Sequence, residues 1–257
     1  MPSIFISGGA AGIGLATAER FAREGWTVGV YDYDDKALAA VKKDHPEFIT
    51  GHLDVRKADE WTKALADFTS HTDGKLDVLD NNAGILVAGR LDAISPEAVA
   101  SQIDIDVTGV TLGAQAAFPY LKATPGAHLV NISSASAIYG QPEIATYSAS
   151  KFYVAGLTEA LELEWQKDDI RVVAIWPLWA KTALADADSK SAKTLGIRIT
   201  PEQIADRVWD SVHPSSADKL IHRTHYSVGM QTTVLNNASK VVPNFLSRIV
   251  NKVIAQA

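Results

Sequence analysis

Short apolar runs alternate along this chain with longer segments in which apolar residues recur at helical spacing. The runs predict buried strands, and the longer segments predict amphipathic helices. We expect strands at 3–6, 27–31, 48–53, 76–80, 128–132, 171–176 and 219–222. We expect helices near 13–24, 34–44, 57–69, 96–121, 147–167 and 201–213. This alternation indicates parallel βαβ units, so we predict one α/β domain whose doubly wound parallel sheet lies between two layers of helices.

A glycine-rich turn follows the first expected strand. Gly8, Gly12 and Gly14 lie between that strand and the helical pattern that begins near residue 13. Glycines at a strand-to-helix turn let the backbone approach a pyrophosphate, and the helix N-terminus offers free N–H groups to it. The turn therefore predicts a Rossmann-like sheet with a dinucleotide site at its first crossover.

An acidic residue ends the second expected strand. Asp32 stands about where a carboxylate binds the ribose hydroxyls of adenosine in such sites. The next residues are Tyr33, Asp34 and Asp35, and no basic residue precedes Lys36. A 2′-phosphate would meet negative charge there, so the sequence favours NAD over NADP as the cofactor.

Three polar residues near the middle of the chain carry the candidate chemistry. Tyr147 and Lys151 stand four positions apart and so share one face of an expected helix. An ammonium beside a phenol stabilises the phenolate, so we expect the tyrosine pKa to fall from about 10 toward neutrality. Ser134 follows the strand expected at 128–132 and would bring a hydroxyl to the same place. Such a tyrosine can exchange a proton with an alcohol or a ketone, so we predict that all three are catalytic.

Composition narrows the function classes. The chain has 257 residues, enough for one large α/β domain, and its net charge of −6 argues against nucleic acid as a partner. It has no cysteine, and its seven histidines show no metal-ligand spacing, so we expect no metal. No apolar stretch approaches a membrane span, and the first strand is expected at residue 3, which leaves no room for a signal peptide. We therefore expect a cytoplasmic protein.

Taken in order, these motifs resemble the short-chain dehydrogenase/reductase family across essentially the whole chain. Residues 7–14 match its TGxxxGxG turn with Ser for Thr, and residues 81–84 match its NNAG segment. Residues 53–55 resemble the segment that contacts adenine, and 177–182 the PGxxxT segment that holds the nicotinamide. The resemblance implies cofactor binding by Gly8, Ala11, Gly12, Ile13, Gly14, Asp32, Tyr33, Asp54, Val55, Asn82, Ala83, Gly84, Tyr147, Lys151, Pro177, Ala180 and Thr182.

The chain departs from the family pattern at Asp106. The family usually has an asparagine there, which helps a main-chain carbonyl hold a water that links the catalytic lysine to solvent. A carboxylate has no N–H to donate unless it is protonated. Near Lys151 it could stay ionised by pairing, or its pKa could rise so that it acts as a neutral donor. We expect the proton relay from Lys151 to solvent to run through the backbone carbonyl. Asp106 would then occupy the catalytic position of the asparagine as a tolerated replacement, without a new catalytic role.

A second departure is Leu178, which stands where the family usually has glycine, between Trp176 and Trp179. With Tyr139 and Tyr153, these residues could line an apolar pocket for bulky or aromatic secondary alcohols and ketones. The alternative is that the tryptophans pack in the core or at a subunit contact. We expect core packing for Trp176, and both interpretations stay open for Trp179.

Two further segments lie toward the C-terminal end. The polar stretch 182–199 predicts a substrate lid, with a surface insertion as the alternative. The apolar stripe at 243–256 predicts an amphipathic helix. We expect this helix to dock on its own domain or a neighbouring subunit rather than on a membrane surface. The resemblance implies a homodimer or homotetramer that uses the helices expected at 96–121 and 147–167.

The three candidate catalytic residues, Ser134, Tyr147 and Lys151, and the resemblance together predict an NAD-dependent enzyme that interconverts a secondary alcohol and a ketone. An epimerase or dehydratase that oxidises its substrate transiently would use the same residues. A protein that senses NAD(H) without turnover is the other alternative. Net formation of NADH separates the dehydrogenase from both.

Overall fold

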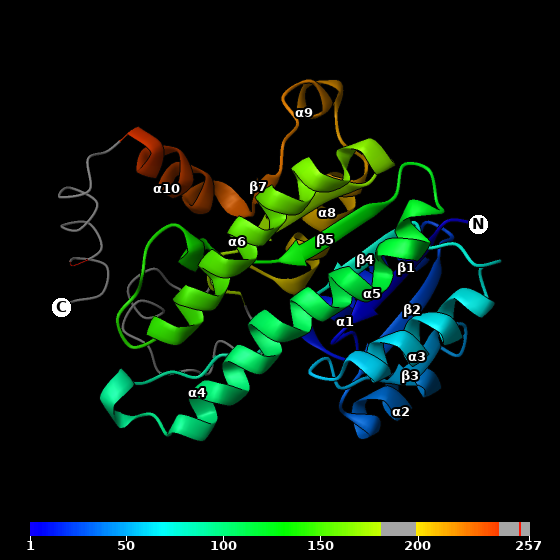
Figure 1. The fold of residues 1–257 in the computed structure, drawn as a ribbon, viewed down its shortest axis with the longest axis horizontal. Helices are drawn as coiled ribbons and strands as arrows, with labels where there is room; N and C mark the ends of the chain where they lie inside the picture. Colours follow the sequence, from blue (N-terminus) through cyan, green and yellow to red (C-terminus); the bar gives the residue numbers. More distant parts are fainter. Residues whose placement is uncertain (181–198, 242–251, 253–257) are drawn as a thin grey trace.

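The computed structural model describes residues 1–180, 199–241 and 252, which build a parallel sheet of seven strands in the order β3-β2-β1-β4-β5-β6-β7 (Figure 1). The strands are β1 (Ser3–Ser7), β2 (Thr27–Asp32), β3 (Ile49–His52), β4 (Val78–Asn81), β5 (His128–Ile132), β6 (Arg171–Trp176) and β7 (His225–Ser227). The strand order reverses between β1 and β4, as in doubly wound folds. The predicted Rossmann-like fold class is confirmed.

Helices flank the sheet on both faces (Figure 1). They are α1 (Gly12–Ala22), α2 (Asp35–Asp44), α3 (Ala58–Ser70), α4 (Pro96–Ile103), α5 (Val110–Lys122), α6 (Ala145–Trp165), α8 (Pro201–Val212), α9 (Ser216–Leu220) and α10 (Gly229–Val241). Local sequence fixes several of their starts. Asp34 accepts hydrogen bonds from the N–H groups of Lys36 and Ala37 to begin α2, and Thr200 forms a capping box with Gln203 to begin α8.

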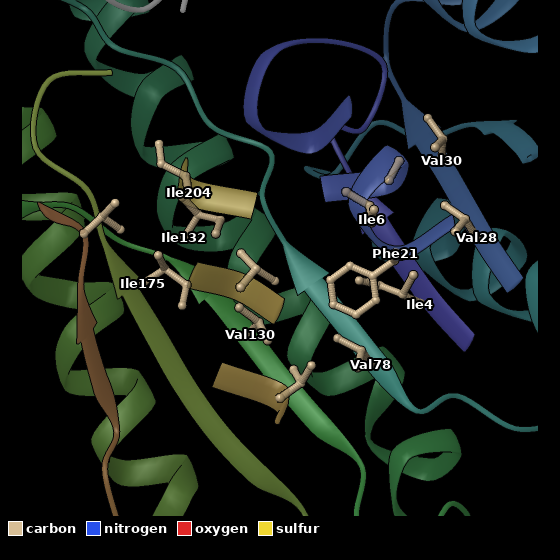
Figure 2. Close-up of a cluster of buried hydrophobic side chains, with 14 of the residues drawn as sticks. Ile4, Ile6, Phe21, Val28, Val30, Val78, Val130, Ile132, Ile175 and Ile204 are labelled. Carbon is tan, nitrogen blue, oxygen red and sulfur yellow. The ribbon is translucent and has the colours of Figure 1, made fainter. Parts of the chain in front are cut away.

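The core has two parts because successive strand residues face opposite sides of the sheet. On one side, Ile4 and Ile6 of β1 pack with Phe21 of α1 and Ile204 of α8 (Figure 2). On the other side, Phe5 stacks on the ring of Tyr31, and α3 and α5 cover them. Continuous apolar runs such as residues 4–6 are therefore buried on both faces, as expected of parallel strands.

The strand expected at 219–222 is wrong. The side chain of Ser215 accepts a hydrogen bond from the N–H of Asp218, which starts the short helix α9 instead. The last strand, β7, follows at His225–Ser227. Leu220 and Ile221 have exposed fractions of 82% and 66%, so this apolar pair is not a buried strand. Helix α10, which the sequence analysis did not predict, follows β7.

The long helix expected at 96–121 is interrupted. Residues Asp104–Gly109 form a π-helical turn between α4 and α5. Such a turn holds an extra residue and is frequent at functional sites. Here the turn contains Asp106, whose side chain is fully buried.

Some expectations fall on residues that the structure does not describe. Thr182 and the predicted lid at 182–199, apart from Ile199, lie outside the described residues. The predicted helix at 243–256 also lies outside them, apart from Lys252. Within the described part of the chain, no helix is long and apolar enough to cross a membrane.

Candidate active site

A cavity of about 600 Å³ opens at the carboxyl ends of the strands, where β1 and β4 lie side by side. Most residues expected to bind the cofactor line it: Gly8, Ala11, Gly12, Ile13, Asp32, Tyr33, Asp54, Val55, Asn82, Ala83, Gly84, Tyr147, Lys151, Pro177 and Ala180. Ser134 lines it as well, whereas Gly14 and Asp106 do not. Ligands bind at this position in doubly wound sheets.

The glycine turn between β1 and α1 has no room for side chains. Gly8 has a φ of +64°, and a Cβ added to it would lie 2.7 Å from the Cα of Ala83. A Cβ on Gly14 would collide with the carbonyl oxygen of Gly8, so Gly14 acts by packing beneath the turn. The bare backbone and the N-terminus of α1 therefore leave a cradle that fits a pyrophosphate.

Asparagines at the end of β4 hold this turn in place. The amide of Asn82 donates hydrogen bonds to the carbonyl oxygens of Ser7 (3.0 Å) and Gly8 (2.8 Å). The amide of Asn81 donates to Asn131 of β5 at 3.0 Å. The segment that resembles NNAG thus ties the turn to the neighbouring strands.

Asp32 ends β2 at the rim of the cavity. Its carboxylate accepts hydrogen bonds from the N–H groups of Ala10 (3.0 Å) and Asp34 (3.1 Å). It is therefore fixed against the glycine turn, where the sequence analysis expected a ligand for the adenosine ribose. Carboxylate oxygens have further lone pairs with which to accept hydroxyl donors.

The sequence analysis missed Arg56, which lines the same end of the cavity. Its guanidinium donates two hydrogen bonds of 2.7 Å to the carboxylate of Asp54 and lies 5.7 Å from the centre of the Tyr33 ring. The hydrogen bond from Arg56 lowers the pKa of Asp54, so the pair is ionised. The sequence shows a basic residue two positions after Asp54, but it does not show that the side chain of this residue turns back to pair with Asp54.

The candidate catalytic side chains come from two elements. Ser134 follows β5, and Tyr147 and Lys151 lie one turn apart on α6. The ammonium of Lys151 donates a hydrogen bond to the carbonyl oxygen of Ile132 at 3.0 Å and lies 5.3 Å from the centre of the Tyr147 ring. Since Lys151 is only 4% exposed, its charge acts on the tyrosine with little screening by water.

The pKa of Tyr147 is nevertheless raised. Burial of the phenol is the largest cause, and the charge of Asp106 adds to it. The charge of Lys151 and a hydrogen bond from Ser134 lower the pKa without reversing the shift. The expected fall of this pKa toward neutrality is therefore wrong for the protein alone, because the cost of burying a phenolate exceeds the stabilisation by Lys151.

The carboxylate of Asp106 is buried behind the cavity wall. It accepts hydrogen bonds from the N–H of Ile85 (2.8 Å) and the hydroxyl of Ser150 (3.2 Å). Burial raises its pKa, whereas the charge of Lys151 and these hydrogen bonds lower it. A Cβ added to Gly84 would lie 3.2 Å from Asp106 Oδ1 and 3.6 Å from Lys151 Nζ, so the lack of a side chain at Gly84 leaves room for both charged groups.

The other end of the cavity is mostly apolar. Leu178 and Trp179, which follow β6, line it together with Ile85 and Leu86. Trp176 is buried with its ring stacked on His225, which confirms the expected core packing. Trp179 both lines the cavity and packs on the core.

The two tyrosines expected in this pocket are not among its lining residues. Tyr153 is 41% exposed, and its hydroxyl lies 2.8 Å from that of Thr111 on α5. The reason is helical geometry, since a residue two positions after Lys151 points to the opposite face of α6. Ser136 and Gln141, which the sequence analysis did not consider, line the cavity instead of Tyr139 and Tyr153.

Comparisons with known proteins agree with this geometry. The model of the short chain dehydrogenase family matches residues 2–193, so the chain belongs to the short-chain dehydrogenase/reductase family. Membership of this family, together with its dehydrogenase relatives, identifies the protein as an oxidoreductase.

Two dehydrogenases are among the relatives of the chain. A trans-4-hydroxycyclohexanecarboxylate dehydrogenase of Sinomonas cyclohexanicum is 36% identical over 189 residues, which cover 70% of this chain and 72% of the relative. A 3-alpha-(or 20-beta)-hydroxysteroid dehydrogenase of Mycobacterium tuberculosis is 35% identical over 184 residues, 70% of each chain.

The fold is also similar to solved structures. A 3-ketoacyl-(acyl-carrier-protein) reductase from Brucella melitensis, complexed with NADH, superposes with a TM-score of 0.79 and 26% identity. The match covers 88% of this chain and 96% of the reductase.

Proposed function

We propose that this protein interconverts a secondary alcohol and a ketone by hydride transfer, with NAD as the cofactor. The observation that carries the proposal is the convergence of Ser134, Tyr147 and Lys151 on one cavity whose other end is the glycine turn. A hydroxyl donor, a proton carrier and a buried cation there are the groups that this reaction needs.

The chain's own residues fit a dinucleotide. The turn at Gly8 would hold the pyrophosphate, and Asp32, positioned by the N–H of Ala10, would accept hydrogen bonds from the adenosine ribose. Arg56 is already paired with Asp54, so the carboxylate of Asp32 dominates where a 2′-phosphate would lie. When bound, the nicotinamide supplies or accepts the hydride.

Each member of the triad has a distinct task in this mechanism. Ser134 donates a hydrogen bond to the substrate oxygen, and its present bonds, of 3.3 Å to Ser136 and 3.5 Å to the Pro177 carbonyl, are long enough to exchange easily. Tyr147 takes the hydroxyl proton during oxidation and returns it during reduction. Lys151, held by the carbonyl oxygen of Ile132, stabilises the phenolate.

The apolar end of the cavity supports a substrate with an apolar body. Leu178 and Trp179 present side chains there rather than the bare backbone of a glycine. The relatives named for hydroxysteroids and a hydroxycyclohexanecarboxylate act on ring compounds, which agrees with this shape.

We also propose that the enzyme is a homodimer or homotetramer. Helix α6 exposes Phe152 by 44% and Leu163 by 77%, next to Tyr153 at 41%. Exposed apolar side chains gathered on one helix are typical of subunit contacts. Measurement of the mass in solution by light scattering tests this proposal, and a monomer would contradict it.

The test of the function is NADH formation across a panel of secondary alcohols of increasing bulk, with NAD⁺ and NADP⁺ in parallel. Turnover with NAD⁺ that is strongest for bulky apolar alcohols is the expected result. Binding of NAD⁺ without any accumulation of NADH would favour the epimerase, dehydratase or sensor alternatives.

A further inference from the structure

Two polar residues of the cavity have no part in the mechanism above. Ser136 lies in the short helix η3 (Ala135–Ala137), and Gln141 lies between η3 and α6. Both line the cavity beside Ser134, and both are 4% exposed. Such buried polar side chains in a pocket orient a ligand when their hydrogen bonds within the protein are incomplete.

The hydrogen bonds of this pair are incomplete. Ser136 Oγ accepts hydrogen bonds from Gln141 Nε2 (3.2 Å) and from Ser134 Oγ (3.3 Å). Ser134 has a single hydroxyl hydrogen, so when it donates to the substrate it no longer donates to Ser136, and the Ser136 hydroxyl can turn to another oxygen. Among the described residues, Gln141 Oε1 is buried without a partner. The Ser136 hydroxyl and the free acceptor of Gln141 are therefore both available to a ligand, and the two side chains are hydrogen-bonded to each other.

A hydroxyl group can use both of them, because it accepts one hydrogen bond and donates another. A ketone or carboxylate oxygen could accept from Ser136 but has no hydrogen for Gln141 Oε1. Satisfying a buried acceptor is a strong source of selectivity, since an analogue that lacks the donor leaves it unpaired.

We propose that Ser136 and Gln141 bind a second hydroxyl of the substrate, on the carbon next to the one that is oxidised. This inference rests on the proposed role of Ser134 as the donor to the reacting oxygen. The hydroxyl oxygens of Ser134 and Ser136 are only 3.3 Å apart, a spacing that suits two substrate oxygens on neighbouring carbons. The substrate class is a vicinal diol, or the corresponding α-hydroxyketone, with an apolar body against Leu178 and Trp179.

The experiment compares cyclohexanol with the cis and trans isomers of 1,2-cyclohexanediol, which have similar apolar bodies. NADH formation gives kcat/KM for each alcohol with the wild type, Ser136→Ala and Gln141→Leu. We expect the wild type to prefer one diol isomer over cyclohexanol by at least about tenfold, and each variant to lower this ratio by about tenfold or more.

Ser211→Ala is the matched control. Ser211 is a buried serine of α8 whose hydroxyl only bonds the carbonyl oxygen of Val208, so its loss should leave the ratio as in the wild type. Thermal melting and NADH binding, followed by fluorescence, show that each variant is folded. If one of the two site variants fails to fold, the other carries the test.

The outcomes separate this inference from the proposed function. Equal use of cyclohexanol and both diols by the wild type, or a ratio that survives in both variants, would overturn the second-hydroxyl site while leaving the dehydrogenase intact. If no alcohol gives NADH, neither these three nor any of the wider panel, the proposed function is overturned and this inference with it.

Discussion

Asp106 Oδ1 and Lys151 Nζ both lie beside Gly84, and both side chains are buried, yet within the described residues they form no ion pair. Each is held by uncharged partners instead, the ammonium by the Ile132 carbonyl and the carboxylate by Ile85 and Ser150. Their charges act on Tyr147 in opposite directions, since Lys151 lowers its pKa and Asp106 raises it. The pKa of Tyr147, the proton carrier, therefore depends on the opposing charges of Lys151 and Asp106.

Replacement of Asp106 by asparagine should shift the pH profile of alcohol oxidation to lower pH. Asparagine can accept from the N–H of Ile85 and donate to the Ser150 hydroxyl, so the local structure is retained. Loss of the negative charge lowers the pKa of Tyr147, and we expect a shift below about one pH unit with little change in maximal turnover. The profile of kcat/KM against pH measures this.

Asp104→Asn is the control for that variant, because Asp104 lies in the same π-helical turn but is exposed. It should leave the profile in place. A shift of a unit or more in Asp106→Asn, or a strong rise in its turnover, would show that Asp106 is not merely tolerated. A shift to higher pH would contradict the sign of the charge effect.

Replacement of Tyr147 by phenylalanine should remove the proton carrier and keep the fold. We expect kcat to fall by about 10²–10⁴-fold, while NADH binds as in the wild type. Tyr153→Phe makes the same chemical change further along α6, at a side chain that is 41% exposed, and should stay active. Retention of full activity by Tyr147→Phe would refute its assignment.

Replacement of Asp32 by alanine should weaken the use of NAD⁺ and relax the choice between the two cofactors. The carboxylate is fixed by Ala10 and Asp34 at the rim of the cavity, so its loss removes the ribose acceptor and the repulsion of a 2′-phosphate together. We expect KM for NAD⁺ to rise by about tenfold or more and the ratio of NADP⁺ to NAD⁺ activity to increase. Asp44→Asn, a charge loss at the exposed far end of α2, should change neither.

Asp80 predicts an unusual dependence of stability on pH. It lies in β4 with Ile6 and Val130 as its cross-strand neighbours, and both carboxylate oxygens are buried without a partner among the described residues. Burial raises its pKa to about 8, whereas an unfolded aspartate titrates near 4. The folded state thus holds the proton more tightly, so stability is fully present below about pH 4 and is lost progressively as the pH rises to about 8.

Relative to the wild type, the variant Asp80→Val should therefore gain stability as the pH rises from 5 to 8, by roughly 2–4 kcal/mol over this interval. Urea unfolding at the two pH values measures the difference. A gain that is independent of pH would mean that Asp80 does not titrate in this range. A loss of stability at both values would mean that its carboxyl group has a partner that it needs.

Much of the fold follows from the sequence because its signals are local. Six of the seven strands lie within the expected ranges or differ from them by a residue or two at an end, since all of these except β3 are mostly buried. Leu220 and Ile221 carry the same apolar signal, but the hydroxyl cap at Ser215 starts a helix before them. A cap of one hydrogen bond outweighs apolar character when no partner strand is available to bury it.

Some features of the candidate site could also be predicted from the sequence, and others could not. The approach of Ser134 to α6 could be predicted, because strand ends of a parallel sheet meet at one edge. The rise in the Tyr147 pKa could not, since burial depends on packing from distant parts of the chain. The roles of Ser136 and Gln141 depend on side-chain orientation, which no spacing rule reports.

Transfer of deuterium tests the central claim most directly. A secondary alcohol that carries deuterium on its reacting carbon is incubated with the enzyme and NAD⁺, and the cofactor is analysed by mass spectrometry. We expect NADH to accumulate with one deuterium per molecule, at a rate that falls by about 10²–10⁴-fold in Tyr147→Phe. A cofactor pool without deuterium, from an enzyme that binds NAD⁺ and the alcohol, would contradict the assignment of this cavity as a dehydrogenase site.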